Sequence, residues 1–272
     1  MKLISREYKV MLDHRQFDDR QAAADAFWQE VEDLASTTLS IRTQGRFDKR
    51  EKQTIVFLDT PDLSLRRKGL VLRRRHGDEA PEYTLKCRSE DRYFAAGTDV
   101  SATGGLDAKH KLEEDIAPPF RCRFSHSNTV KIGGVGADRG LVTTLGEAGA
   151  MFPILRKLAH DGRPIPEETV LLPVHNLSVF ERVFTGASFV FGDLGDRDDD
   201  ESSVALILWS TVKEGRPLVA EFSFRLKDKE EQFTRELAES ARSFYEAIQR
   251  LDWCRPDAVT KTTFIYRDKG DD

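Results

Sequence analysis

Apolar and polar residues alternate over several short stretches of the chain, and this period of two predicts β-strands. The first of these stretches covers residues 5–12, and a last one covers 259–267. The others lie at 55–59, 69–75, 82–88, 111–116, 179–191, 204–212 and 218–226. A turn built on Thr60-Pro61-Asp62 joins the second strand to the third.

Apolar residues at helical spacing predict helices over 18–35, 147–160 and 229–251. Asp18 or Asp19 can cap the first of them. Many antiparallel-looking strands with few helices predict one α+β domain over residues 1–272. Residues 89–110, 120–145 and 193–203 are interpreted as loops or insertions outside its core, the last at a hairpin tip.

Composition narrows the class of protein. The 272 residues include 42 Lys and Arg against 47 Asp and Glu, a formal net charge of −5, which argues against a general nucleic-acid binder. No apolar run of membrane-spanning length occurs, and the first residues show no signal-peptide pattern, so we expect a cytoplasmic protein without a membrane partner. Cys87, Cys122 and Cys254 are widely spaced and are expected to be reduced thiols.

One stretch is strongly cationic despite the acidic chain. Six cations fall between residues 66 and 75 with no acid among them. The period of two places Arg73 and Arg75 on one face of a strand and Arg74 on the other. Arg74 is expected to face solvent, together with the cations at 66–68.

The same one-sided arrangement of ionic residues recurs in other predicted strands. The sets that share a face are Ser5, Glu7 and Lys9; Thr84 and Lys86; Lys111, Glu113 and Asp115; and Glu221, Ser223 and Arg225. Such faces can simply meet water. If they instead surround a common space, that space is lined by Arg, Lys and carboxylates, which suits a polyanion together with a divalent cation.

Several of these residues also match a known family in order and spacing. The matching segments are Asp59-Thr60-Pro61-Asp62-Leu63 with Leu65, Gly69 and Leu72-Arg73-Arg74-Arg75; Thr84-Leu85-Lys86; Lys111-x-Glu113-x-Asp115; Val219-Ala220-Glu221; and Lys261-Thr262. On these segments the chain resembles the CYTH superfamily, the triphosphate tunnel metalloenzymes. That superfamily includes thiamine triphosphatases, inorganic tripolyphosphatases and class IV adenylate cyclases.

The resemblance implies an antiparallel β-barrel tunnel of about eight strands with helices packed outside, and metal-dependent hydrolysis of a small triphosphate or polyphosphate. It implies Mg²⁺ or Mn²⁺ as the cofactor, held by Glu7, Glu113, Asp115 and Glu221. Phosphate binding is assigned to Lys9, Arg73, Arg75, Lys86, Arg182 and Lys261. The catalytic set is Glu7, Lys9, Arg73, Arg75 and Lys86.

Two departures from the family pattern keep alternatives open. Ser5 and Ser223 stand where the family has carboxylates. A phosphate-binding module without turnover is therefore a second hypothesis, and a class IV adenylate cyclase is a third, for which the sequence shows no adenine pocket. Residues 134–140 miss the dinucleotide-binding glycine spacing, and the acidic run from 196 lacks the glycine and terminal acid of a calcium-binding EF-hand loop.

Overall fold

The computed structural model describes residues 1–38, 41–77, 80–132, 141–191, 201–228, 230–255, 257–258 and 260–267. Its strands are β1 Ser5–Leu12, β2 Arg42–Gln44, β3 Lys49–Asp59, β4 Leu70–His76, β5 Glu82–Ser89, β6 Ala108–Ala117, β7 Arg121–Lys131, β8 Ala159–His160, β9 Arg163–Pro164, β10 Leu172–Pro173, β11 Val179–Thr185, β12 Ser188–Val190, β13 Glu201–Ser210 and β14 Val219–Lys227.

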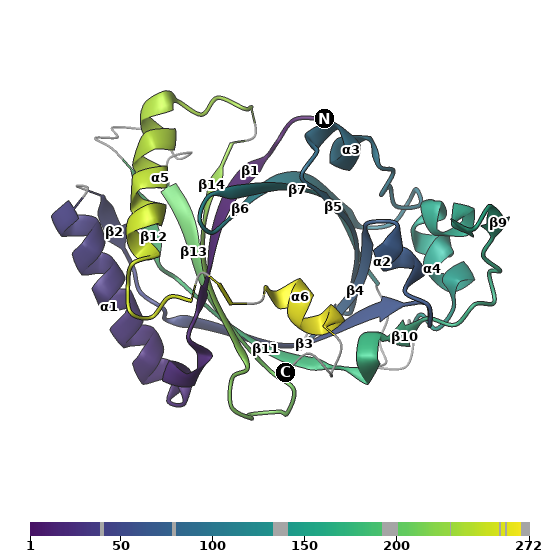
Figure 1. Ribbon diagram of the computed structural model, residues 1–272, viewed down its shortest axis with the longest axis horizontal. Helices are drawn as coiled ribbons and strands as arrows, with labels where there is room; N and C mark the ends of the chain where they lie inside the picture. Colours follow the sequence, from purple (N-terminus) through teal and green to yellow (C-terminus); the bar gives the residue numbers. More distant parts are fainter. Residues whose placement is uncertain are drawn as a thin grey trace. The chain divides into compact units, whose positions relative to one another are not determined.

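The α-helices are α1 Arg20–Thr38, α2 Ser64–Arg67, α3 Arg92–Gly97, α4 Leu145–Met151, α5 Arg235–Ile248 and α6 Lys261–Tyr266, shown in Figure 1. Short 3-10 helices occur at His14–Phe17, Pro153–Lys157 and Val174–Asn176. Within the described ranges no helix is both long and apolar enough to cross a membrane.

The main sheet has a closed pattern of strand pairings. Its strands follow the order β10-β3-β4-β5-β7-β6-β1-β14-β13-β12-β2, and β11 pairs with both β13 and β3. The path from β3 through β4, β5, β7, β6, β1, β14 and β13 to β11 therefore returns to β3, and this ring counts nine strands in the described part of the chain. The pairing of β1 with β6 is parallel, while that of β1 with β14 is antiparallel. The fold is thus a closed, mixed β-barrel with helices, close to the predicted barrel of about eight strands.

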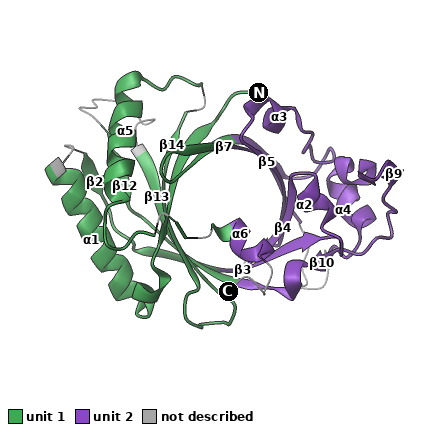
Figure 2. Ribbon diagram, viewed as in Figure 1, with its two compact units in different colours: residues 1–52, 113–123, 180–261 green, residues 53–112, 124–179, 262–272 purple. Residues whose placement is uncertain are grey.

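The chain divides into two compact units, shown in different colours in Figure 2. Unit 1 consists of residues 1–52, 113–123 and 180–261, and unit 2 consists of residues 53–112, 124–179 and 262–272. The predicted single domain over 1–272 stays a prediction.

The core of unit 1 lies between the sheet and two long helices. Phe27 of α1, Phe244 of α5 and Phe224 of β14 are buried in one apolar cluster. Tyr8 of β1 stacks on Phe224, with ring centroids 4.6 Å apart. Figure 1 shows α1 and α5 beside β12, β13 and β14, so the helices cover the face of these strands that carries the rings.

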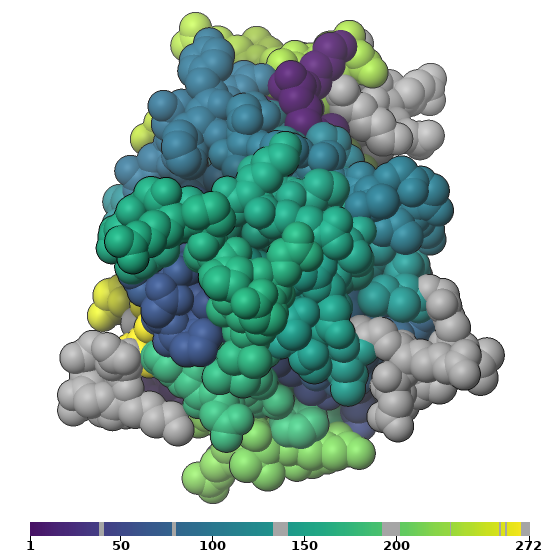
Figure 3. All heavy atoms as spheres, turned by 90° about the vertical axis from the view of Figure 1, so that its right-hand side faces the viewer, coloured from purple at the N-terminus to yellow at the C-terminus, as the bar shows by residue number. Residues whose placement is uncertain are grey.

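The core of unit 2 packs against one face of β4, β5 and β7. Leu72 of β4, Leu85 of β5 and Val130 of β7 are buried in a second cluster, together with Leu145 of α4 and Phe152. The capping box of Thr144 and Glu147 begins α4, and the 3-10 helix that starts at Pro153 follows it. The segment after residue 141 occupies the centre of the face of unit 2 seen in Figure 3.

Most of the predicted elements are confirmed, with shifted ends. The strand over 5–12 has the predicted bounds, and α1 begins after Asp19, whose carboxylate accepts a hydrogen bond from Ala22 N. The predicted helix over 147–160 was too long, because Pro153 ends α4 and only a 3-10 turn continues. The predicted helix over 229–251 begins only at Arg235, since Thr234 caps it and accepts from Leu237 N.

Other predictions were wrong. Residues 120–145 are not a loop insertion, because β7 runs through Arg121–Lys131 between β5 and β6. The tail is not a strand, because Lys261–Tyr266 is helical. Part of 89–110 forms α3 and the start of β6. Residues 201–203 belong to β13, while 133–140 and 192–200 lie outside the described residues.

Candidate functional site: ionic faces of the two units

Unit 1 collects acids and cations on one face of three neighbouring strands. In the pairing of β1 with β14, Glu7 lies opposite Arg225 and Lys9 lies opposite Ser223. On the other side of β1, Glu7 pairs with Asp115 of β6. Because the intervening residues of these strands pack into the aromatic core, the ionic residues share the opposite face, as the alternation predicts. We call this face the ionic face of unit 1.

Lys9 links two of the predicted metal ligands. Its Nζ lies 3.1 Å from Glu7 Oε2 and 2.8 Å from Asp115 Oδ1. Both carboxylates are largely buried, with side chains 12% exposed. An ammonium group therefore holds the position between these two acids.

Arg225 is the second cation of the ionic face. Its Nη2 donates to Glu7 Oε2 at 2.8 Å, and its Nε lies 3.8 Å from Glu113 Oε1. Burial favours a raised pKa for Glu7, but Lys9 and Arg225 outweigh it and hold the pKa well below the ordinary value of 4.5. The Glu7 carboxylate in turn raises the pKa of Arg225 above its ordinary value.

Ser5 takes part in the same arrangement as a neutral donor. It lies opposite Glu113 in the β1–β6 pairing, and its Oγ donates to Glu113 Oε1 at 3.2 Å. The serine is buried, so this hydroxyl satisfies an oxygen of Glu113 without adding charge.

The fourth predicted metal ligand, Glu221, lies with a different lysine. Lys261 Nζ is 2.8 Å from Glu221 Oε1 and 5.6 Å from the centroid of the Trp209 ring. The indole Nε1 of Trp209 donates to Glu181 Oε2 at 2.7 Å, and Glu181 is buried. Lys261 is thus held by an acid and an aromatic face, and a buried acid fixes the orientation of that ring.

Arg182 is not brought together with these residues. Glu181, its neighbour on β11, lies opposite Trp209 of β13, so Arg182 lies on the other face of the strand. Arg182 Nη2 instead pairs with Glu214 Oε2 in the turn between β13 and β14. We therefore remove Arg182 from the phosphate-binding set. Glu181 and Trp209 were missed, because residues 179–184 carry apolar side chains at both odd and even positions, which leaves the phase of the alternation undecided.

Unit 2 carries a cationic and hydroxyl-rich face of its own. Arg73 lies opposite Thr84 in the pairing of β4 with β5, and Thr84 lies opposite Thr129 of β7. Arg73 Nη2 is 3.4 Å from Thr84 Oγ1, and the hydroxyls of Thr84 and Thr129 are 2.8 Å apart. By strand alternation Arg75 and Lys86 share this face. We call it the cationic face of unit 2.

Arg88 extends the cationic face toward α6. It lies opposite Ser125 of β7, two positions after Lys86 on the same strand. Its Nη1 donates to Thr262 Oγ1 at 2.6 Å. The alternation of Thr84, Lys86 and Arg88 in the sequence could have identified it. Arg74 lies on the opposite face of β4 from Arg73 and Arg75, as predicted. It does not simply face solvent, because its side chain is only partly exposed and its Nε is buried.

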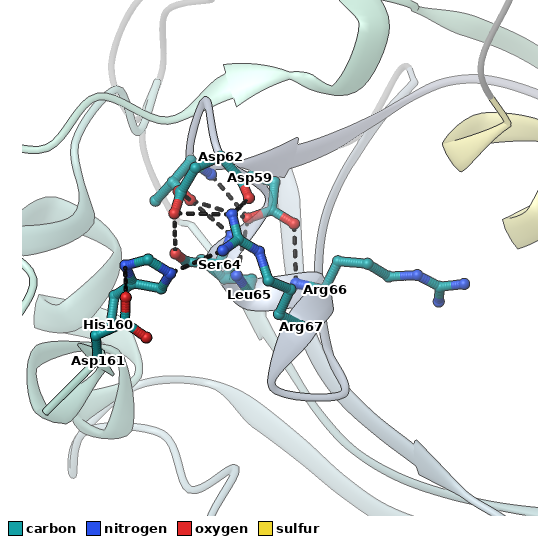
Figure 4. Close-up of polar contacts among 9 residues, drawn as sticks. Asp59, Asp62, Ser64, Leu65, Arg66, Arg67, His160 and Asp161 are labelled. Atoms are coloured by element: carbon teal, nitrogen blue, oxygen red, sulfur yellow. Dashed lines mark hydrogen bonds and ion pairs between the residues drawn. The ribbon is translucent and has the colours of Figure 1, made fainter.

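The motif from Asp59 to Leu65 has a structural role that Figure 4 makes visible. The buried Asp59 carboxylate accepts from the backbone N–H groups of Thr60 and Leu65 through Oδ1 and from Arg66 N through Oδ2. The motif thereby fixes the start of α2 just before β4. The side chain of Arg66 extends away from this cluster, and its guanidinium lies 4.8 Å from the centroid of the Tyr266 ring.

A divalent cation of the kind that the resemblance implies would need its ligands from the ionic face of unit 1. Carboxylate oxygens are suitable ligands for Mg²⁺ or Mn²⁺. However, Lys9, Arg225 or Lys261 lies against each of the four acids. Across the described ranges, no three His, Cys, Asp or Glu side chains form a group that could hold a metal ion. In this arrangement the residues do not fit a metal centre, and the expected cofactor stays a prediction.

No family model and no curated protein matches the chain. Among solved structures it is similar to a putative adenylate cyclase from Bacillus halodurans, with 11% identity, coverage of 97% of this chain and 98% of that chain, and a TM-score of 0.45. It is also similar to a putative adenylyl cyclase from Hippeastrum described as having a dominant triphosphatase activity, with 13% identity, 97% and 95% coverage, and a TM-score of 0.38. A protein from Pyrococcus horikoshii has 10% identity, 93% and 94% coverage, and a TM-score of 0.38.

Proposed function

We propose that this chain binds a small triphosphate-containing molecule and hydrolyses it. The observation that carries the proposal is the ionic face of unit 1. Glu7, Glu113 and Glu221 are acids with little exposed surface, and each lies against a cation on one side of strands whose other side is an aromatic core. Burying charge is costly, and the aromatic core does not require it, so a ligand that uses these groups is the better explanation.

The cationic face of unit 2 supports the same substrate class. Arg73, Arg75 and Lys86 supply guanidinium and ammonium donors of the kind that bind phosphate oxygens. Thr84 and Thr129 add hydroxyl groups beside Arg73. A linear triphosphate carries more negative charge and spans a greater length than a single phosphate, so it can reach more such donors along the strands.

Hydrolysis breaks one P–O–P link and transfers the phosphoryl group to water. For this chemistry most of the catalysis comes from positioning and from neutralising charge on the transferred group. In our proposal Arg73, Arg75, Lys86 and Lys261 hold the phosphates, and Lys9 neutralises charge beside Glu7. The ionic face as described does not fit a divalent cation, and the assay therefore varies the metal separately from the substrate.

The test is release of phosphate or pyrophosphate from tripolyphosphate, thiamine triphosphate and ATP, each with EDTA, Mg²⁺ or Mn²⁺. We expect hydrolysis of at least one substrate by the natural chain. Lys86→Gln should lower kcat/KM about tenfold or more, because a charge-assisted hydrogen bond contributes about 1.5–3 kcal/mol. Lys2→Gln removes an exposed lysine that pairs with Glu230; it is the matched control and should leave kcat/KM unchanged. Absence of hydrolysis with every substrate and metal would contradict the proposed turnover.

A binding module without turnover is the second candidate, and a specific observation favours it. The Lys9 and Arg225 side chains lie against the acids that would otherwise hold a metal ion. Binding of tripolyphosphate without release of any product would support this candidate. Formation of cyclic AMP from ATP would instead indicate the adenylate cyclase alternative.

A further inference from the structure

Arg225 has a position that the proposed hydrolysis does not by itself explain. Its guanidinium reaches acids that belong to two different strands, Glu7 of β1 and Glu113 of β6. The Arg225 Nε is buried and makes no hydrogen bond, although it lies within ion-pair distance of Glu113. A guanidinium has five N–H donors. The side chain is 32% exposed, so part of the group is accessible to a ligand.

The charge balance of the ionic face depends on this residue. Arg225 is one of three cations, with Lys9 and Lys261, that lie against Glu7, Glu113, Asp115 and Glu221. Without Arg225 this face would carry one positive charge fewer, which disfavours an anionic ligand.

Ser5 and Ser223 are neutral, and they also limit the negative charge of the ionic face. Carboxylates at these two positions would each add one more negative charge to the ionic face. Ser223 lies opposite Lys9, and Ser5 donates to Glu113, so both positions belong to this face. Their hydroxyls reduce the need for an added cation, and the fixed guanidinium reduces it further.

The charge of Arg225 is also permanent. Glu7 and Glu113 both raise the pKa of the guanidinium, so it stays protonated wherever the protein is folded. A metal ion, by contrast, leaves when the free metal is removed by a chelator.

We propose that Arg225 is a built-in cation that replaces the charge of a divalent ion in ligand binding, so that the chain binds tripolyphosphate without a metal. This inference rests on the proposed triphosphate binding, but it does not depend on turnover. It assigns Arg225 as a residue that determines the metal requirement.

The experiment is calorimetry of tripolyphosphate binding to the full chain, once in EDTA and once in Mn²⁺, together with a titration of Mn²⁺ alone. We expect the natural chain to bind the anion in EDTA with a Kd within about tenfold of that in Mn²⁺, and not to bind Mn²⁺ alone. Arg225→Gln should weaken binding in EDTA by about tenfold or more, since one charge-assisted contact is lost. It should also gain Mn²⁺ binding, because Glu7 and Glu113 lose their guanidinium.

Two variants serve as controls. Arg225→Lys keeps the charge and should retain most of the metal-free affinity. Arg242→Gln removes an exposed arginine that pairs with Glu246 on α5 and should bind as the natural chain does. Equal binding by Arg225→Gln and Arg242→Gln in EDTA would overturn the proposal.

The outcomes separate this inference from the proposed function. Binding by the natural chain that strictly requires Mn²⁺ would overturn the inference alone. No binding under any condition would overturn the proposed function as well. If circular dichroism shows that Arg225→Gln does not fold, Arg225→Met, which keeps most of the side-chain length without the charge, takes its place in the EDTA and Mn²⁺ titrations.

Discussion

Glu7 is the residue whose ionisation is most clearly tied to its neighbours. Lys9 and Arg225 lie 3.1 and 2.8 Å from the same carboxylate oxygen. We expect Glu7→Gln to lower the free energy of unfolding at pH 7 by about 2 kcal/mol, because two cations lose a charged partner in a largely buried place. Urea denaturation of both proteins measures this difference.

The pH dependence of that difference gives a sharper test. The pKa of Glu7 is lowered in the folded protein, so its contribution is fully present above the ordinary value of 4.5 and is lost as the pH falls below it. The difference in unfolding free energy between the natural chain and Glu7→Gln should therefore be constant from pH 6 to 8. It should become smaller as the pH falls below 4.5. Glu239→Gln removes an exposed partner of Arg235 and should show almost no gap at any pH. A gap that grows in acid would contradict the assignment.

At the scale of single elements, the start of α2 depends on both oxygens of Asp59. Oδ1 accepts from two backbone N–H groups and Oδ2 accepts from a third. Asp59→Asn replaces one of the two accepting oxygens with an NH2 group, which must then face at least one of these N–H donors. We therefore expect a loss of about 2 kcal/mol in unfolding free energy. Asp91→Asn is the matched control, because one oxygen of Asp91 accepts both capping bonds of α3 and an amide oxygen can replace it. Similar losses for the two variants would show that the second oxygen of Asp59 is not needed.

Strand alternation in β4 gives a second prediction at this scale. Arg73 and Arg75 lie on the cationic face, while Arg74 lies on the side of Leu72, which is buried in the core of unit 2. Arg73→Gln and Arg75→Gln should each weaken tripolyphosphate binding about tenfold or more in calorimetry, and Arg74→Gln should not. Weakening of equal size in all three variants would mean that the whole cation cluster acts through its net charge and not through one face.

The sequence predicts elements well where one face is plainly apolar and fails where polarity is mixed. β1 and β5 were found because Tyr8, Tyr83 and Leu85 alternate with polar residues. β7 was missed because His126 and Asn128 occupy the core side, opposite Cys87 and Leu85, so its alternation cannot be recognised. In the same way, the phase of the alternation in β11 was wrong by one position. The prediction therefore placed Arg182 on the ligand side of the strand, where the structure has Glu181. α6 was predicted as a strand because its residues after Lys261 are all β-branched or aromatic, types that favour strands.

The whole molecule combines a net negative charge with local cationic surface. Its formal charge is −5 and its isoelectric point is about 5.8. Long-range attraction of polyanions is therefore weak, and binding must come from short-range contacts on the ionic and cationic faces. A compact triphosphate should bind, whereas duplex DNA, which needs an extended positive surface, should not.

Thermal unfolding tests this difference in one experiment. A ligand present at 100 times its Kd stabilises the folded state by about 2.7 kcal/mol, which for a chain of this size corresponds to a rise in Tm of roughly 5 °C. We expect tripolyphosphate to give such a shift in low salt and a smaller one at 300 mM salt, because salt screens the partly exposed cations. A short DNA duplex at the same phosphate concentration should give no shift. Equal shifts from DNA and tripolyphosphate would indicate a general polyanion surface and would contradict a site built for a small triphosphate.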